Sequence, residues 1–92
     1  MIIGKKLREL REEKGLLLRQ VAAELEVDTA YISKMERGEK NIRKEHIFKF
    51  AEVYQINKQD LITLWLAERV YDIVKDEKTA INALNFVIKK LK

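Results

Sequence analysis

The amino-acid sequence predicts an all-α fold. Its 92 residues include no proline and only three glycines, so the residues that make sharp turns between strands are scarce. Apolar residues recur at intervals of three and four along most of the chain, which is the period of an amphipathic helix. A chain this short buries only roughly 60 to 65% of its unfolded surface. We therefore expect one compact helical unit of modest stability, which a partner subunit would strengthen.

The first two predicted helices are short and amphipathic. The first ends near Gly15, and its apolar stripe consists of Ile3, Leu7 and Leu10. The second ends near Leu25 or Glu26, and its apolar positions are Leu18, Val21, Ala22 and Leu25. Two residues then separate it from Asp28, whose carboxylate is a predicted N-cap. Helices joined so tightly are expected to cross at a large angle, as in a helix-turn-helix.

Four further helices follow from the same spacing. Ile32 and Met35 form a narrow apolar stripe before Gly38 ends the third helix. The fourth has its apolar face at Ile47, Phe50, Ala51 and Tyr54. Asn57 is the predicted cap of a long fifth helix that reaches about Lys75. The sixth is predicted by Ile81, Leu84, Ile88 and Leu91.

Composition excludes several classes of site. Without cysteine there is no disulfide and no thiolate metal site, and the single histidine, His46, cannot assemble a zinc site alone. No cofactor, metal or catalytic residue is therefore expected, nor is a small-molecule ligand evident. No apolar run reaches membrane-spanning length, so we expect a soluble cytoplasmic protein. The net charge of +4 is mild, but residues 34–49 hold six basic residues against three acidic ones.

An ordered series of residues crosses the second and third predicted helices: Ala22, Leu25, Val27, Tyr31-Ile32-Ser33 and Glu36-Arg37-Gly38. Within the stretch LRQVAAELEVDTAYISKMERG, this series resembles the phage-repressor-like (Xre-type) helix-turn-helix family, and the resemblance runs from about Ile3 to Leu61. It implies a four- to five-helix repressor-like DNA-binding domain over residues 1–61. A helical C-terminal dimerisation extension over residues 62–92 is expected to pack with it as one compact unit.

The resemblance implies a recognition helix at about Asp28–Arg37 that enters the major groove of double-stranded DNA. The residues expected to contact bases are Thr29, Ala30 and Lys34. The Thr29 hydroxyl can donate or accept and Ala30 can touch a thymine methyl, whereas Lys34 can donate to guanine O6 and N7. Asp28 either caps the helix or accepts from a cytosine amine.

Other residues of that helix and residues in the segments that flank it are expected to contact the DNA backbone. These residues are Arg19, Gln20, Tyr31, Ser33, Arg37, Lys40, Asn41, Arg43 and Lys44. Such contacts fix orientation and give salt-dependent affinity but carry little sequence information. Tyr31 either packs against the second helix or hydrogen-bonds a phosphate.

The sequence departs from the family pattern at two places. Leu17 and Leu18 occupy positions where the family has Ser or Thr followed by Gln, so Arg19 is expected to supply the phosphate attraction instead. Glu26 stands where the family commonly has glycine, which costs about 1 kcal/mol if that residue is left-handed. The resemblance also implies a partly buried ion pair between Arg11 and Glu36 that orients the recognition helix.

The C-terminal extension is expected to form a homodimer, because the fifth helix is apolar on more than one side. Leu61, Leu64 and Trp65 are expected to face their own domain. The expected dimer interface consists of Leu66, Val70, Ile73, Val74, Ile81, Leu84, Ile88 and Leu91. In the alternative arrangement, the sixth helix folds back over the fifth within one chain.

These features predict a sequence-specific transcriptional regulator rather than an enzyme. It is expected to bind a pseudo-palindromic operator as a homodimer and to be associated with the nucleoid. The alternative is an antitoxin-like or assembly protein whose apolar C-terminal helices bind another protein, with DNA binding secondary.

Overall fold

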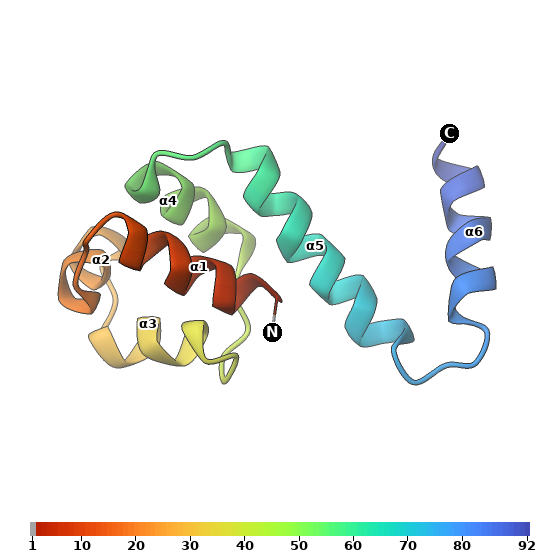
Figure 1. Cartoon of the computed structure of the whole chain (residues 1–92), viewed down its shortest axis with the longest axis horizontal. Coiled ribbons are helices and arrows are strands. Elements are labelled where there is room, and N and C mark those ends of the chain that lie inside the picture. Colours follow the sequence, from red (N-terminus) through yellow and green to blue (C-terminus); the bar gives the residue numbers. More distant parts are fainter. Residues whose placement is uncertain (1) are drawn as a thin grey trace.

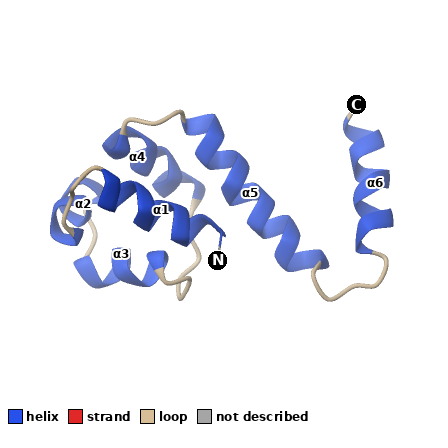
Figure 2. Ribbon diagram, viewed as in Figure 1, coloured by secondary structure: helices blue, strands red, loops and turns tan. Residues whose placement is uncertain are grey.

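The computed structural model describes residues 2–92, and within that range it contains six helices and no strand. The helices are α1 (Ile2–Glu13), α2 (Leu18–Leu25), α3 (Thr29–Glu36), α4 (Lys44–Tyr54), α5 (Lys58–Val74) and α6 (Ala80–Leu91). Figure 1 shows α1 to α4 gathered in one cluster, from which α5 leads away towards a separate α6. The ribbon coloured by secondary structure shows only helices and short connections (Figure 2). The predicted all-α fold class is therefore confirmed.

The hydrophobic core lies inside the cluster of α1 to α4 and the first turns of α5. Its buried apolar side chains include the stripes expected of the first four helices, except Leu18, which is half-buried, together with Ile42 and Leu61. Leu64 and Trp65 are half-buried against this core, so the domain-facing side of α5 is as expected. Asn57 accepts hydrogen bonds from the backbone N–H groups of Gln59 and Asp60, which makes it the N-cap of α5.

Two helices end in a left-handed residue that is not glycine. Glu26 follows α2 with φ 58°, and Gln55 follows α4 with φ 53°. In both places the N–H of the following residue reaches back to a carbonyl five positions earlier, from Val27 to Ala22 and from Ile56 to Ala51. This hydrogen bond satisfies a helix-terminal carbonyl and turns the chain sharply. The turn at Glu26 therefore forms despite the missing glycine.

The part of the C-terminal extension that lies in α5 packs on the cluster through Leu64, Trp65 and Glu68, whereas α6 does not pack on it. The chain measures 43 × 25 × 21 Å and its radius of gyration is 14.9 Å, against about 12 Å for a compact domain of this length. No residue of α6 is buried, and α6 stands apart from α5 beyond a short turn (Figure 1). The expected boundary after residue 61 falls inside α5, which continues without a break. None of the described helices has the length and apolar character needed to span a membrane.

Candidate nucleic-acid interface

The helix-turn-helix is formed by α2 and α3, which pack on each other across the turn at residues 26–28. Val27 is half-buried against the core, while the side chains on either side of it face solvent. Because the turn is so short, the start of α3 is fixed by the end of α2. The third helix lies along one edge of the cluster, away from α6 (Figure 1).

The inner face of α3 is held by three kinds of contact with α1. Ile32 and Met35 are fully buried in the core. Gly4 of α1 lies so close to the C-terminal end of α3 that an added Cβ would stand 2.6 Å from the Met35 carbonyl oxygen and 2.7 Å from that of Glu36. Real Cβ atoms essentially never approach an atom that closely. Only glycine therefore allows this helix approach.

The third contact is the expected ion pair between Arg11 and Glu36, which is present. Arg11 donates from Nε to Oε2 of Glu36 at 2.8 Å and from Nη2 to Oε1 at 3.1 Å. A further bond, from Nη1 to the Leu16 carbonyl oxygen at 3.1 Å, ties the same guanidinium to the loop after α1. The Glu36 hydrogen bond raises the pKa of Arg11. The pair links α1, α3 and the loop before α2, and neither charge faces the outer surface of α3.

The outer face of α3 is small and polar. The three expected base-contact residues, Thr29, Ala30 and Lys34, are all exposed. They are short or flexible side chains on a helix whose opposite side is buried, which is the arrangement needed to approach base edges. Asp28 occupies the N-cap position with extended backbone, but its side chain makes no capping hydrogen bond. The capping interpretation is thus wrong for the carboxylate, which remains exposed at the start of the helix.

Tyr31 and Ser33 are half-buried at the sides of α3. The Tyr31 ring meets His46 of α4 edge-on, with 5.7 Å between ring centroids. Its ring contact is therefore with α4 as well as with the core beneath. His46 is half-buried, its Nδ1 atom has no hydrogen-bond partner among the described residues, and burial lowers its pKa. His46 therefore packs against the Tyr31 ring and is not a fully solvated surface residue.

Arg37 is engaged by residues of its own segment. Its Nε donates to Oε2 of Glu39 at 2.6 Å, and its Nη1 donates to the Ser33 hydroxyl at 2.7 Å. The bond to Glu39 raises the pKa of Arg37 and lowers that of Glu39. Glu39 was not singled out from the sequence, although a carboxylate two residues after an arginine is a readable signal. The negative charge of Glu39 partly offsets the positive charge of Arg37 at this end of α3.

The loop after α3 supplies the remaining positive charge on this flank. Lys40, Asn41, Arg43 and Lys44 are all exposed, whereas Ile42 between them is buried and fixes the loop to the core. On the other flank, Arg19 and Gln20 are exposed at the start of α2. The Gln20 Oε1 atom accepts from the Leu17 N–H at 2.8 Å, but the Leu17 side chain has no acceptor to offer in return. This half of a capping box orders the first turn of α2.

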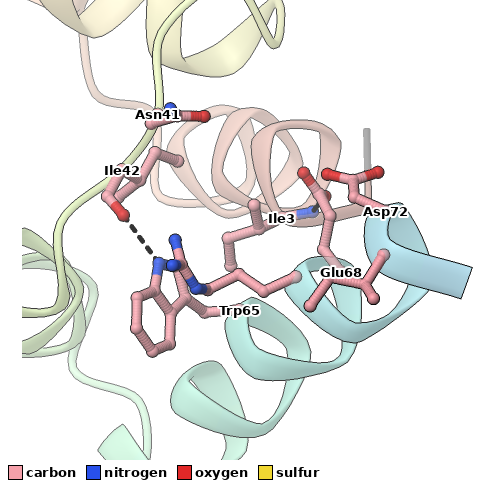
Figure 3. A pocket seen from close by; sticks show the side chains of 8 residues that line it. Ile3, Asn41, Ile42, Trp65, Glu68 and Asp72 are labelled. Carbon is pink, nitrogen blue, oxygen red and sulfur yellow. Dashed lines mark hydrogen bonds between the residues drawn. The ribbon is translucent and has the colours of Figure 1, made fainter.

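Two contacts outside the predicted interface were missed by sequence reasoning. Trp65 donates from Nε1 to the Ile42 carbonyl oxygen at 2.6 Å, and Glu68 accepts from the Ile3 N–H at 2.8 Å through Oε1 (Figure 3). Glu68 is 5% exposed, although its position on α5 shows no signal of burial beyond an interrupted apolar stripe. The donors and acceptors lie 23 and 65 residues apart, so no local pattern links them.

Comparison with known proteins agrees with this arrangement. The helix-turn-helix family model matches residues 7–61, which include α2, the turn and α3. The chain is also 37% identical over 62 residues to the HTH-type transcriptional regulator DdrOP3 of Deinococcus deserti. That match covers 67% of this chain and 48% of the relative, so the chain spans about half the length of the curated relative it matches. With the α2–turn–α3 geometry, the matched residues show that the chain belongs to the Xre-type helix-turn-helix family.

Proposed function

We propose that this protein is a sequence-specific transcriptional regulator that binds double-stranded DNA through α3. The observation that carries the proposal is the contrast between the two sides of that helix. Ile32, Met35 and the Arg11–Glu36 pair hold its inner side, whereas Thr29, Ala30 and Lys34 stand exposed on its outer side. A helix that is held on one side and carries short or flexible side chains on the other suits direct reading of the major groove.

The division of roles follows from position on the interface. Thr29, Ala30 and Lys34 read base edges, and the residues on the two flanks hold the phosphates: Arg19, Gln20, Tyr31, Ser33, Arg37, Lys40, Asn41, Arg43 and Lys44. Arg37 can reach a phosphate only by sharing or releasing its bond to Glu39. The flank after α3 therefore relies on Lys40, Arg43 and Lys44, none of which is in an ion pair among residues 2–92.

The proposed regulator acts as a homodimer on a pseudo-palindromic operator. Large apolar side chains of α5 and α6 are exposed, with Ile73 at 77% and Leu91 at 81%. The proposed interface comprises Leu66, Val70, Ile73, Val74, Ile81, Leu84, Ile88 and Leu91. Val87 of α6, between Leu84 and Leu91 in helical register, is exposed as well.

Charge also favours a second copy as the occupant of this surface. The end of α5 and the turn after it carry a small acidic excess, with Asp72, Asp76 and Glu77 against Lys75 and Lys78. At the end of α6 the charged residues are all basic: Lys89, Lys90 and Lys92. In a two-fold pair with antiparallel α6 helices, the basic end of one copy lies beside the acidic turn of the other.

Selection of bound duplexes from a random pool tests the proposal as a whole. The expected product is two inverted half-sites whose centres lie about one helical turn apart. Recovery of no enriched duplex would overturn DNA recognition, and an enriched single half-site would overturn the paired mode.

Sedimentation at micromolar concentration tests the homodimer separately. The expected mass is twice that of the chain, and Ile73→Lys should reduce it to that of the monomer because a buried lysine would lack a partner. Phe48→Lys, at an exposed apolar residue of α4, is the matched control and should leave the dimer intact. A monomeric protein that copurifies with a stoichiometric partner would favour the protein-interaction alternative.

A further inference from the structure

The proposed pairing surface is joined to the DNA-binding cluster by one uninterrupted helix. The first turns of α5 pack on α4 and α1, and its last turns carry exposed apolar side chains such as Ile73. No linker separates the cluster from the α5 part of that surface, and α6 follows after the turn at residues 75–79. The direction in which α5 leaves the cluster therefore determines where the recognition helix of a second copy lies.

Two long-range hydrogen bonds hold α5 beyond residue 61, where the family match ends. The Trp65 indole N–H donates to the carbonyl oxygen of Ile42, with 2.6 Å between nitrogen and oxygen. One turn further on, the Glu68 carboxylate accepts from the backbone N–H of Ile3 at 2.8 Å. Figure 3 shows these two side chains reaching from α5 towards the loop on one side and the start of α1 on the other.

Each bond ends on a segment that is directly attached to the proposed interface. Ile42 lies between Asn41 and Arg43, in the loop after α3 that is proposed to contact the DNA backbone. Ile3 precedes Gly4, which lies against the last carbonyls of α3. Through these two segments the orientation of α5 is coupled both to the recognition helix and to the backbone-contacting loop.

The two bonds are directional contacts at a place where packing is incomplete. A pocket of about 230 Å³ lies between α5, the start of α1 and the loop, lined by Ile3, Ile42, Trp65 and Glu68 among others. Close-packed interiors resist tilting of a helix, but an open pocket does not. The hydrogen bonds therefore contribute more to the angle of α5 than they would in a filled core.

The local electrostatics stabilise both bonds. Glu68 is almost completely buried, and a buried carboxylate is unfavourable unless it is hydrogen-bonded. The first turn of α1 supplies the donor, which is the otherwise unpaired Ile3 N–H, together with the positive end of the helix dipole. The Arg69 guanidinium lies over the Trp65 ring, 5.1 Å from its centroid, in a cation–π contact.

We infer that Trp65 and Glu68 are positioning residues that set the half-site spacing this regulator accepts. The inference rests on the proposed function. Neither side chain contacts DNA. Both act by fixing the angle between α5, which carries the pairing surface, and α3, which reads the bases.

The test compares the protein with Trp65→Phe, Glu68→Met and the double variant. Trp65→Phe keeps an aromatic ring but removes the donor, and Glu68→Met keeps the volume but removes the acceptor. Glu68→Gln retains an acceptor oxygen and serves as the rescue variant. Tyr71→Phe removes an exposed hydroxyl from the same helix and is the matched control. Circular dichroism establishes whether each variant is folded. If the double variant does not fold, the two single variants provide the test.

The first readout is affinity for duplexes with the selected spacing and with spacings one base pair longer or shorter. The unaltered protein should prefer its own spacing by about tenfold or more, and the double variant by less than about threefold. The affinity of the variants for an isolated half-site should equal that of the unaltered protein. A general loss of stability would instead lower this affinity. Glu68→Gln and Tyr71→Phe should retain the preference. An unchanged preference in both single variants and the double variant overturns the inference.

The second readout is independent of DNA. Because the chain has no cysteine, Ala23→Cys on the exposed side of α2 gives a unique site for a spin label. The distance distribution between labels in the two copies should be narrow in the parent and broad in the double variant. Equal widths, or a protein that stays monomeric, overturn the inference. If the parent selects no duplex, the proposed function fails, while the label distances still decide whether Trp65 and Glu68 fix the arrangement of the copies.

Discussion

The guanidinium of Arg11 holds the carboxylate of Glu36 by two hydrogen bonds, of 2.8 and 3.1 Å, and thereby joins α1 to α3, the proposed recognition helix. The Arg11 side chain is 14% exposed and that of Glu36 is 5% exposed. Because both side chains are buried, removing one member of the pair should lower the free energy of unfolding. The remaining charge would have neither its partner nor water to interact with.

Arg11→Ala should lower the free energy of unfolding by about 3 kcal/mol, measured by urea denaturation, because it leaves the Glu36 carboxylate buried and unpaired. The matched control is Arg8→Ala, which breaks the exposed pair between Arg8 and Glu12 on the same helix. That change should lower the free energy of unfolding by less than about 0.5 kcal/mol. Equal losses in the two variants would show that burial of the Glu36 carboxylate does not matter.

Gly4→Ala should destabilise the protein even though alanine is the better helix former. In an open helix the change would stabilise by about 1 kcal/mol. Here the added methyl group meets the carbonyl oxygens of Met35 and Glu36, so α1 and α3 must separate, at a cost of about 1 to 3 kcal/mol. Thermal unfolding gives the sign directly.

Gly15→Ala distinguishes crowding from backbone strain in that experiment. Gly15 has φ 67° and no atom within 4 Å of an added Cβ, so its replacement is strained but not crowded. The expected loss is about 1 kcal/mol, with DNA affinity unchanged. Gly4→Ala should also weaken DNA binding, because it displaces the recognition helix. A stabilising effect of Gly4→Ala would mean that the helices are further apart than described.

Glu26→Gly should raise the melting temperature. Glu26 adopts φ 58° at the end of α2, a conformation that costs an L-residue about 1 kcal/mol and glycine very little. Part of the gain is offset because glycine increases the entropy of the unfolded chain. Gln55→Gly, at φ 53°, provides an independent repeat at the end of α4. A lower melting temperature in both variants would refute the expected strain.

Lys34→Ala and Arg43→Ala should weaken DNA binding in different ways. Loss of Lys34 should alter preference at one or two operator positions, because its ammonium is the proposed donor to base edges. Loss of Arg43 should weaken all sequences about equally and flatten the dependence of affinity on salt, because one phosphate contact is lost. Fluorescence anisotropy over a series of salt concentrations and operator variants separates the two. Uniform loss in both variants would contradict the division into base and backbone contacts.

The first four helices were predictable because each buries a single stripe, and a period of three and four residues is visible without knowledge of the partner. Ile3, Leu7 and Leu10 illustrate this, and all three are buried in the core. The cap at Asn57 was predictable for a similar reason, since its hydrogen bonds reach only two and three residues along the chain.

Contacts that depend on spatial neighbours were not predictable in this way. Glu68 is a charged residue on a helix, and the hydrogen bond from the Ile3 N–H offsets the free-energy cost of burying its carboxylate. Gly4 lies inside α1, and no residue near it in the sequence indicates that α3 crosses there. Asp28 had the right chemistry and position for a cap, but its carboxylate does not bond to the backbone. The Arg11–Glu36 pair was expected only through resemblance to a family, because 25 residues separate its members.

The lack of any buried residue in α6 has a consequence for how this protein responds to its own abundance. A helix of 12 residues is marginal in water by itself. If α6 is ordered by pairing, then its folding and the association of two copies form one equilibrium, and its melting midpoint rises with protein concentration. Operator occupancy would then increase more steeply than in proportion to the amount of protein made. A gene under such control would switch over a narrower range of regulator dose than a monomer could achieve.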